Sequence, residues 1–263
     1  MGVLTLGPEG TFSHQAATLL FPKEKVVFTS TITEVFMRLS DPQFSAGVIP
    51  LDNAFLGFKE ETISNLMKYE FSLSKKIELK TSLCLAGDSL DIEHLYAHES
   101  SLEMCPLSIK KHCPKAKVIK TLNNAYSAIQ YLAHPKNSAA LLPSFSLKFY
   151  DLPVLVDEMQ DDKESQTTFF AISREKVKKG SKSYASCFLL FSEEMASTKN
   201  QIYAQSEETK VPILKLKNLV LQEGETPLYF IETEGHFEEK SVHAFYKALS
   251  EKFLIKPLGS YPV

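Results

Sequence analysis

Short apolar runs alternate with amphipathic stretches over the N-terminal part of the chain. The runs at 3–6, 26–29 and 47–50 have the length and aliphatic content of buried strands, and the stretches 11–20 and 31–40 carry apolar residues at helical spacing. This βαβαβ pattern predicts a mostly parallel sheet covered by helices on both faces. Such sheets bind ligands at the carboxyl ends of their strands.

A second set of alternating elements follows and leads back to the first. We predict strands at 71–79, 82–86, 95–97, 116–119, 138–141, 155–159 and 168–172, and helices at 60–69, 101–112, 123–132 and up to 150. Two α/β lobes are therefore expected, the second inserted into the first, with the chain returning near Ser165. Ligands in such architectures bind in the cleft between the lobes.

The composition changes at residues 174–183. The sequence REKVKKGSKS is basic and polar and contains a glycine, which is typical of a linker. Beyond it we predict strands at 186–191, 213–221, 227–232 and 255–257, and helices at 195–204 and 238–253. The order βαββαβ predicts a small ferredoxin-like regulatory module.

Composition and charge exclude several classes of protein. Of 263 residues only 10 are glycine, 44% are hydrophobic and 23% are charged, as in ordinary packed globular proteins. The 29 basic and 32 acidic side chains give a formal charge of −3, and the basic residues are scattered, so we expect no nucleic-acid partner. Neither a secretion signal nor a long apolar span is visible, which favours a cytoplasmic protein with no membrane partner. The four cysteines lack the paired spacings of a disulfide framework and are expected to be reduced and buried.

Two turns at predicted strand ends carry polar groups. In GPEGTFS, residues 7–13, Thr11 and Ser13 beside Gly10 can satisfy free backbone N–H groups, and the start of a helix favours an anion. An ordinary capped turn is the alternative. In GVIPLDNA, residues 47–54, Asn53 could bind a substrate hydroxyl or carboxylate and Asp52 could orient it or act as an acid. An Asx turn explains this pair equally well.

Other candidate groups have weaker support. His94 and His98 have the spacing of a helical metal site, but the sequence between them is strand-like, so we expect no metal. Cys105 with His98 as its base lacks an orienting partner. The segment SQTTFFAI, residues 165–172, places hydroxyl groups directly before an apolar strand, as a plain β-strand with threonine capping also would.

Five segments in this order resemble prephenate dehydratases, the enzymes that make phenylpyruvate on the route to phenylalanine. They are GPEGTFSHQAA at 7–17, GVIPLDN at 47–53 with Gly57, AHESSLEMC at 97–105, SQTTFFAI at 165–172 and LGSYP at 258–262. The resemblance covers essentially the whole chain. It implies a two-lobed, periplasmic-binding-protein-like domain over 1–176, with lobe one at about 1–79 plus 160–176, lobe two at about 80–159 and the active site between them. It also implies an ACT domain over 183–263, which in the family binds phenylalanine and helps to form dimers or tetramers.

The resemblance also implies a reaction and the residues that perform it. The family expels carbon dioxide and the ring hydroxyl of prephenate together, driven by aromatisation and without metal or cofactor, so the chain is expected to be a carbon–oxygen lyase. The threonine of the family's Thr-Arg-Phe motif falls on Thr167, which we expect to donate to the departing oxygen, with Asn53 as the second catalytic residue. The expected substrate-binding residues are Gly10, Thr11, Ser13, Asp52, Ser165, Thr168 and Phe169.

Several positions depart from the family pattern. The arginine of that motif, which is suited to gripping a carboxylate, is replaced by Thr168. Further replacements in the same segments are Asp52 for glutamate, Ala54 and Ala97 for serine, Met104 for glutamine and Ser165 for asparagine. Losing one donor to a developing charge costs about 100- to 1000-fold in rate. Slow catalysis, a changed substrate and a non-catalytic ligand-binding homologue are therefore alternatives.

Arogenate is the changed substrate that the charges suggest, because it carries an amino group in place of the keto oxygen. Losing the arginine, keeping Asp52 and gaining Glu99 would make the cleft less hostile to an ammonium group. In the ACT portion, the family's Glu-Ser-Arg-Pro segment reads QEGE at 222–225, and its Asn-Pro-Gly-Ala-Leu turn has no better match than NQI at 200–202. We therefore predict weak or absent inhibition by phenylalanine.

Overall fold

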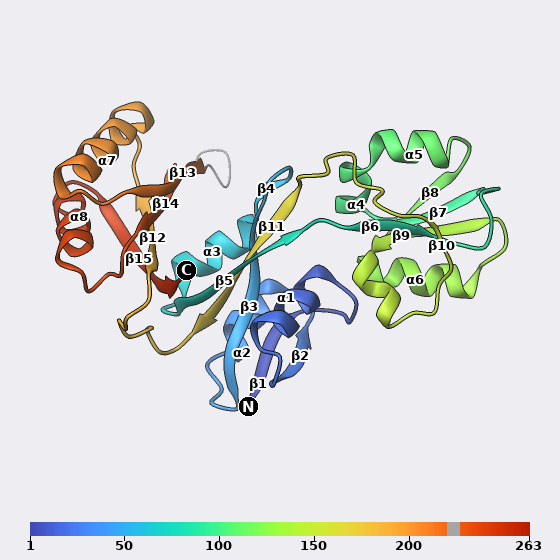
Figure 1. The fold of residues 1–263 in the computed structure, drawn as a ribbon, viewed down its shortest axis with the longest axis horizontal. Coiled ribbons are helices and arrows are strands. Elements are labelled where there is room, and N and C mark those ends of the chain that lie inside the picture. The colour runs from blue at the N-terminus through green and yellow to red at the C-terminus, as the bar shows by residue number, and fades with distance from the viewer. Residues whose placement is uncertain (220–226) are drawn as a thin grey trace.

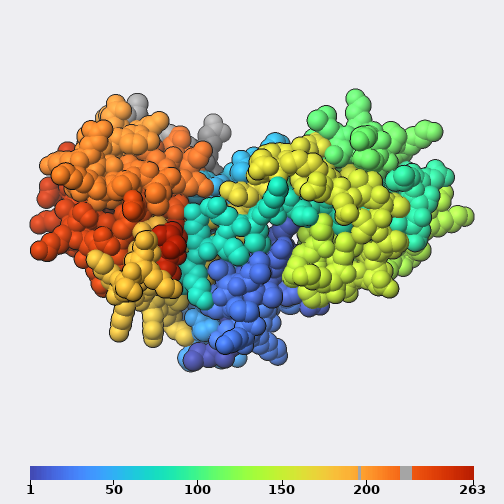
Figure 2. All heavy atoms as spheres, viewed as in Figure 1, coloured from blue at the N-terminus to red at the C-terminus, as the bar shows by residue number. Residues whose placement is uncertain are grey.

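The computed structural model describes residues 1–219 and 227–263. Within this part of the chain the strands form three sheets, each with its own helices (Figure 1). The first lobe lies between the second lobe and the C-terminal module, which form opposite ends of the molecule (Figure 2). None of the described helices is long and apolar enough to cross a membrane.

The first sheet contains strands from both the beginning and the end of the two-lobed region, before and after the inserted second lobe. Its strands, in spatial order, are β2 (Lys25–Thr29), β1 (Gly2–Leu6), β3 (Phe44–Asn53), β11 (Gln166–Ser173) and β5 (Ser72–Lys80), with the short β4 (Gly57–Phe58) paired to β3. Its helices are α1 (Phe12–Leu20), α2 (Ile32–Arg38) and α3 (Glu60–Lys68). β1 pairs parallel with β2 and β3, whereas β11 runs antiparallel to β3 and β5. The predicted return of the chain into the first lobe is therefore confirmed.

The strands of this sheet are apolar on both faces because each face is covered. Val48, Phe169 and Ala171 pack with α1, whereas the alternate positions Ile49 and Phe170 pack with α2 and α3. This alternation follows from the two-residue period of a strand. Away from the register shift between Thr168 and Phe169, where Leu51 is an extra residue on β3, neighbouring residues of the two strands consequently face opposite sides of the sheet.

The second sheet lies entirely within the inserted segment. Its strands, in spatial order, are β10 (Val154–Val156), β6 (Leu83–Ala86), β9 (Ser138–Pro143), β7 (His94–His98) and β8 (Lys117–Thr121). Its helices are α4 (Glu99–Met104), α5 (Pro106–His112), α6 (Asn124–Ala133) and the 3-10 helix η1 (Ser144–Lys148). His94 and His98 thus lie at the two ends of a strand, as the sequence indicated.

Two predicted helices of this lobe were wrong in extent. The single helix expected at 101–112 is divided into α4 and α5, because Pro106 has no N–H for a helix interior and instead begins the second helix. The helix expected up to residue 150 is only the short η1. The four cysteines are free and buried, as predicted.

The C-terminal module has the predicted βαββαβ order. Its elements are β12 (Tyr184–Phe191), α7 (Met195–Thr209), β13 (Ile213–Leu219), β14 (Leu228–Glu234), α8 (Lys240–Ser250) and β15 (Leu254–Pro262), with the strands antiparallel in the spatial order β13-β14-β12-β15. Helix α7 is longer than expected and ends where Lys210 adopts a left-handed conformation, with φ of 56°. Strand β15 is also longer than expected, because it pairs with β12 along its whole length.

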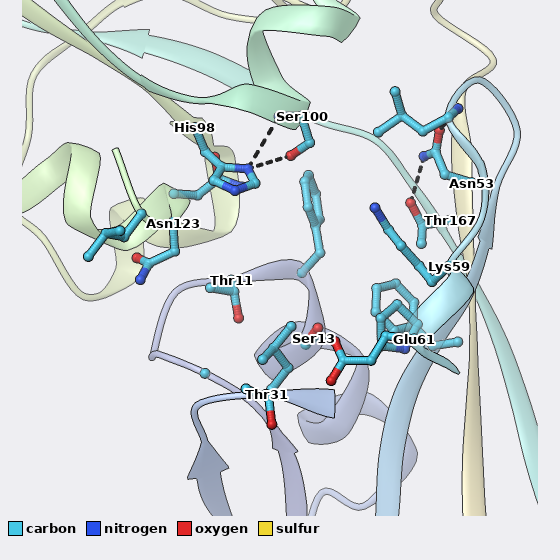
Figure 3. Close-up of a pocket in the computed structure, with 18 of the residues that line it drawn as sticks. Thr11, Ser13, Thr31, Asn53, Lys59, Glu61, His98, Ser100, Asn123 and Thr167 are labelled. Atoms are coloured by element: carbon cyan, nitrogen blue, oxygen red, sulfur yellow. Dashed lines mark hydrogen bonds between the residues drawn. The ribbon is translucent and has the colours of Figure 1, made fainter. Parts of the chain in front are cut away.

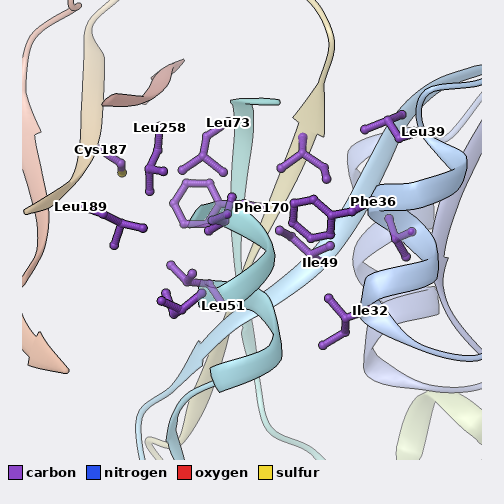
Figure 4. Close-up of a cluster of buried hydrophobic side chains, with 14 of the residues drawn as sticks. Ile32, Phe36, Leu39, Ile49, Leu51, Leu73, Phe170, Cys187, Leu189 and Leu258 are labelled. Carbon is purple, nitrogen blue, oxygen red and sulfur yellow. The ribbon is translucent and has the colours of Figure 1, made fainter. Parts of the chain in front are cut away.

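One face of the C-terminal sheet packs on the first lobe. Cys187, Leu189 and Leu258 share a buried cluster with Leu73 and Phe170 of the first lobe (Figure 4). The other face is covered by α7 and α8. The module and the first lobe therefore have a common hydrophobic core, which holds them in a fixed relation.

Candidate active site

A cavity of about 360 Å³ lies between the two lobes (Figure 3). The first lobe contributes the beginnings of α1, α2 and α3, the end of β3 and the beginning of β11, and the second lobe contributes α4 and the beginning of α6. Its polar lining consists of Thr11, Ser13, Ser30, Thr31, Asn53, Lys59, Glu61, His98, Ser100, Asn123, Asn124 and Thr167. This is the position at which a two-lobed α/β protein binds a small ligand.

Five helices begin at this cavity. Their N-cap residues, which all line it, are Thr11, Thr31, Lys59, His98 and Asn123. A helix carries a partial positive charge at its N-terminus, where backbone N–H groups lack partners within the helix. Several such ends around one cavity favour a negatively charged ligand.

Asn53 and Thr167 face each other across neighbouring strands at one side of the cavity. The Nδ2 of Asn53 donates to the Thr167 hydroxyl at 2.8 Å, while the Oδ1 of Asn53 accepts from the backbone N–H groups of Phe55 and Leu56 at 3.0 and 2.8 Å. These bonds fix which end of the amide faces Thr167. Because the Thr167 oxygen accepts from Asn53, its own O–H remains available to donate into the cavity.

Lys59 and Glu61 place opposite charges at the first-lobe side of the cavity. Both lie at the beginning of α3, and the Lys59 side chain points into the cavity (Figure 3). The Glu61 carboxylate accepts from the backbone N–H and the hydroxyl of Thr33, at 2.8 Å each. Glu61 therefore has partners in α2, whereas the Lys59 ammonium is positioned to meet a ligand.

His98 provides a donor from the second lobe. Its Nδ1 accepts from the backbone N–H of Ser100 at 3.3 Å and lies 2.7 Å from the Ser100 hydroxyl. Burial lowers the pKa of His98, and the nearby Lys59 ammonium lowers it further, against the opposing effect of Glu99 and Glu103. His98 is therefore neutral near pH 7, and with Nδ1 as acceptor its proton is on Nε2.

His14 lies behind the turn at Gly10 and holds it in place. The Gly10 N–H donates to the Nδ1 of His14 at 3.1 Å, and the ring packs against Phe28 and Phe149 with centroids 5.0 Å away. Gly10 has φ of +87°, a conformation that favours glycine. Burial lowers the pKa of His14, and Glu9 opposes this shift.

Acidification should destabilise the protein partly through His14. A folded-state pKa below the unfolded value near 6.5 gives stability that is present above pH 6.5 and is lost as the pH falls through the folded pKa. Protonation also removes the acceptor for the Gly10 N–H. We expect the melting temperature to fall between pH 7 and pH 5, and to fall less in a His14→Gln variant, whose amide oxygen keeps an uncharged acceptor. An equal loss in the two proteins on thermal unfolding would contradict this role.

The structure brings five of the predicted site residues to one cavity and separates the others from it. Thr11, Ser13, Asn53, Thr167 and Phe169 line the cavity together. The remaining four residues lie elsewhere. The carbonyl of Gly10 accepts from the Ser146 hydroxyl at 2.7 Å, and Ser165 lines a neighbouring cavity of about 330 Å³. Asp52 and Thr168 line a third cavity beside the C-terminal module. Asp52 and Thr168 are opposite one another in register and face away from Asn53 and Thr167.

This placement corrects two interpretations of the replaced residues. The side chain at position 168 lies on the other face of the sheet, so the threonine there leaves the cation content of the main cavity unchanged. The two carboxylates that were expected to favour the ammonium group of arogenate do not line the main cavity either. Asp52 pairs with Lys215, and the exposed Glu99 pairs with Lys120. Met104 does line the main cavity, and Ala97 is fully buried in β7.

Sequence reasoning missed Lys59, Glu61 and Asn123. Asn123 could have been found as an N-cap, since its side chain accepts from the N–H of Tyr126 at 2.8 Å three residues into the helix. Lys59 comes two residues after a recognised glycine, but its direction depends on the turn between β4 and α3.

Comparisons with known proteins give one consistent family. A family model for prephenate dehydratase matches residues 3–177. The bifunctional chorismate mutase/prephenate dehydratase of Aquifex aeolicus (strain VF5) is 26% identical over 269 residues, covering 99% of this chain and 73% of that protein. The crystal structure of prephenate dehydratase from Arthrobacter aurescens in complex with L-Phe has a TM-score of 0.85 at 18% identity and covers 100% of this chain and 90% of that one. The structure of the quorum quenching acylase GqqA has a TM-score of 0.84 at 16% identity, covering 100% and 98%. The fold is thus shared by proteins with different activities.

Proposed function

The chain belongs to the prephenate dehydratase family, and from this premise we propose that it converts prephenate to phenylpyruvate, carbon dioxide and water as a carbon–oxygen lyase in phenylalanine biosynthesis. The electrons of the bond between the ring and its carboxylate enter the ring as carbon dioxide leaves. The ring C–O bond breaks at the same time, and the departing hydroxide takes up a proton to become water. Formation of the aromatic ring drives the reaction. The remaining tasks of the protein are to bind a substrate with two carboxylates and to stabilise the leaving hydroxide.

The observation that carries this proposal is the fixed hydrogen bond from Asn53 to Thr167. Because the amide occupies the acceptor side of the Thr167 oxygen, the hydroxyl proton is directed to a ligand in the cavity. A preorganised donor at the point where negative charge develops is the main means by which enzymes stabilise such a transition state. Thr167 is proposed to donate to the departing oxygen, and Asn53 to hold it in that role.

The dianion is proposed to be held by the helix ends and by two side chains from opposite lobes. The beginning of α1 offers the Ser13 hydroxyl and backbone N–H groups of its first turn to one carboxylate, whereas the Thr11 hydroxyl donates to the carbonyl of Pro8 at 2.9 Å. Lys59 from the first lobe and the Nε2–H of His98 from the second supply further donors. The cavity therefore has a cation of its own in Lys59, whichever residue stands at position 168 on the other face of the sheet.

Replacing Lys59 with methionine should raise the KM for prephenate between about tenfold and a hundredfold while changing kcat little. A hydrogen bond to a charged group contributes about 1.5–3 kcal/mol, and a carboxylate that does not react is bound equally in ground and transition states. Steady-state kinetics measure the effect, and Lys23→Met, which removes an exposed lysine of the first lobe, is the matched control. A KM equal to that of the control would exclude Lys59 from substrate binding.

The direct test is to incubate the purified protein with prephenate, and separately with arogenate, near neutral pH. We expect phenylpyruvate from prephenate at a higher rate than phenylalanine from arogenate. Glu61 lines the cavity and could receive an ammonium group, so a preference for arogenate would identify arogenate dehydratase activity instead. Binding of either acid without turnover would favour the non-catalytic homologue.

The C-terminal module is proposed to be an ACT domain through which the chain forms homodimers or homotetramers. Of the two replaced segments at the phenylalanine site, residues 200–202 lie within α7, and residues 222–225 lie outside the described part of the chain. Weak or absent phenylalanine inhibition therefore stays a prediction, which calorimetry showing micromolar phenylalanine binding would contradict. A cytoplasmic location stays a prediction from the sequence.

A further inference from the structure

Asn53 and Lys59 lie on one hairpin, residues 52–59, in which β4 folds back onto the end of β3. Asp52 pairs with Phe58 and Asn53 with Gly57, and the Lys59 N–H donates to the carbonyl of Leu51 at 2.9 Å. One face of this hairpin forms part of the main cavity. The position of the hairpin therefore determines where both Asn53 and Lys59 meet a ligand.

The C-terminal module contacts the other face of the same hairpin. Lys215, in β13, forms an ion pair with Asp52, and its Nζ lies 5.4 Å from the centroid of the Phe58 ring. The Phe58 ring in turn lies 5.3 Å from that of Phe230, which is fully buried in β14. The ion pair is partly shielded from water, since the side chains of Lys215 and Asp52 are 26% and 12% exposed. One ammonium group thus joins both strands of the hairpin to the module.

We propose that Lys215 is a positioning residue for the active site. Asp52 and Asn53 are adjacent on β3 and face opposite sides, so a shift of Asp52 moves the Asn53 amide relative to Thr167. Lys215 fixes Asp52 from outside the cavity and so maintains the geometry that directs the Thr167 proton. This role rests on the proposed dehydratase function, because it concerns the same catalytic residues.

The residue at position 168 explains why the positive charge beside Asp52 comes from the C-terminal module. Thr168 lies directly opposite Asp52 on β11, and a cavity of about 570 Å³ adjoins the two residues. In the Thr-Arg-Phe motif that this segment resembles, an arginine at this position would place its guanidinium on the same face as Asp52. Here the threonine is too short to supply a charge, and Lys215 provides it from another module. The active site then depends on the docked module even without a regulatory ligand.

The test compares Lys215→Met with Lys217→Met in the full-length protein. Lys217 is an exposed lysine two residues further along the same strand, so the control removes an equal charge from the same region. We expect Lys215→Met to lower kcat for prephenate between about tenfold and hundredfold, because small misplacements of a catalytic group have effects of this size. Hydrogen–deuterium exchange should become faster in peptides covering 52–59 in Lys215→Met only.

Two further variants separate positioning from a general loss of structure. Lys215→Arg keeps a cation beside Asp52. It should retain the kcat of the unmodified protein and the slow hydrogen–deuterium exchange of residues 52–59. The double variant Lys215→Met/Thr168→Arg restores a cation from β11 and should recover most of the lost rate. The proposal is overturned if Lys215→Met equals Lys217→Met in both measurements, if Lys215→Arg is as impaired as Lys215→Met, or if the folded double variant does not recover. If the unmodified protein does not turn over prephenate, that result counts against the proposed function, and the exchange data alone decide the role of Lys215.

Discussion

Thr167→Ala should lower kcat for prephenate about 100- to 1000-fold, the range found when one donor to a developing negative charge is removed. The KM should change little, because the hydrogen bond to the departing oxygen strengthens only as the C–O bond breaks. Thr167 is only half-buried, and its hydroxyl accepts from a side-chain amide, so the melting temperature should stay close to that of the unmodified protein. Steady-state kinetics with thermal unfolding on the same samples measure both expectations.

Two neighbouring substitutions serve as controls for Thr167→Ala. Thr167→Ser retains a hydroxyl at the same place and should keep most of the rate. Thr168→Ala removes a hydroxyl from the adjacent residue, which faces the cavity beside the C-terminal module, and should leave kcat nearly unchanged. A larger loss in Thr168→Ala than in Thr167→Ala would mean that the reacting face of β11 has been assigned wrongly.

The sequence predicted the elements of the fold well because their signals are local. Alternation of apolar runs and amphipathic stretches located the described strands of all three sheets except the two-residue β4, and the polar segment at 174–183 separates β11 from β12. The helix predicted at 101–112 is interrupted at Pro106. The effect of proline on a helix is also local, so this interruption could have been predicted from the sequence. The error at the end of β15 arose from its pairing with the distant β12, whereas α7 ends at a local cap in which the Lys210 N–H donates to the carbonyls of Ser206 and Glu207.

The candidate site was predicted only in part, because a site depends on which face a residue occupies. Strand alternation alone would have separated Thr167 from Thr168 and Asn53 from Asp52, since one residue along a strand reverses the face. Strand alternation could not have predicted that helices from both lobes begin at the same cavity. Asn123 reaches the cavity only because the second sheet places α6 opposite α1, which follows from long-range packing.

The dependence of the site on the C-terminal module was also absent from the sequence pattern. The ion pair between Asp52 and Lys215 joins residues 163 positions apart. Neither residue is unusual in its local segment, and Lys215 is one of the polar positions in the ordinary apolar and polar alternation of β13. The contact becomes apparent only when the apolar face of the C-terminal sheet is docked on the first lobe, which buries Cys187, Leu189 and Leu258.

Asn53→Ala should lower kcat about 100-fold or more and also destabilise the protein, since Asn53 serves both Thr167 and the hairpin. Its removal leaves the N–H groups of Phe55 and Leu56 without the acceptor they have in the folded chain. Each of these two hydrogen bonds contributes about 0.5–1.5 kcal/mol, so chemical denaturation should show a loss of about 1–3 kcal/mol. The double variant Asn53→Ala/Thr167→Ala should be scarcely slower than Thr167→Ala, because residues that act as one unit give non-additive losses.

Asn53→Asp separates the two roles of this residue. Aspartate keeps an oxygen for the N–H groups of Phe55 and Leu56, so the stability of the hairpin should be retained. Its carboxylate has no N–H to donate to Thr167 and would instead accept the hydroxyl proton, turning the donor away from the ligand. We therefore expect Asn53→Asp to lose at least as much rate as Asn53→Ala while remaining more stable. If Asn53→Asp kept the rate of the unmodified protein, the orientation of the Thr167 proton could not be the basis of catalysis, because that variant changes the orientation and leaves the hydroxyl in place.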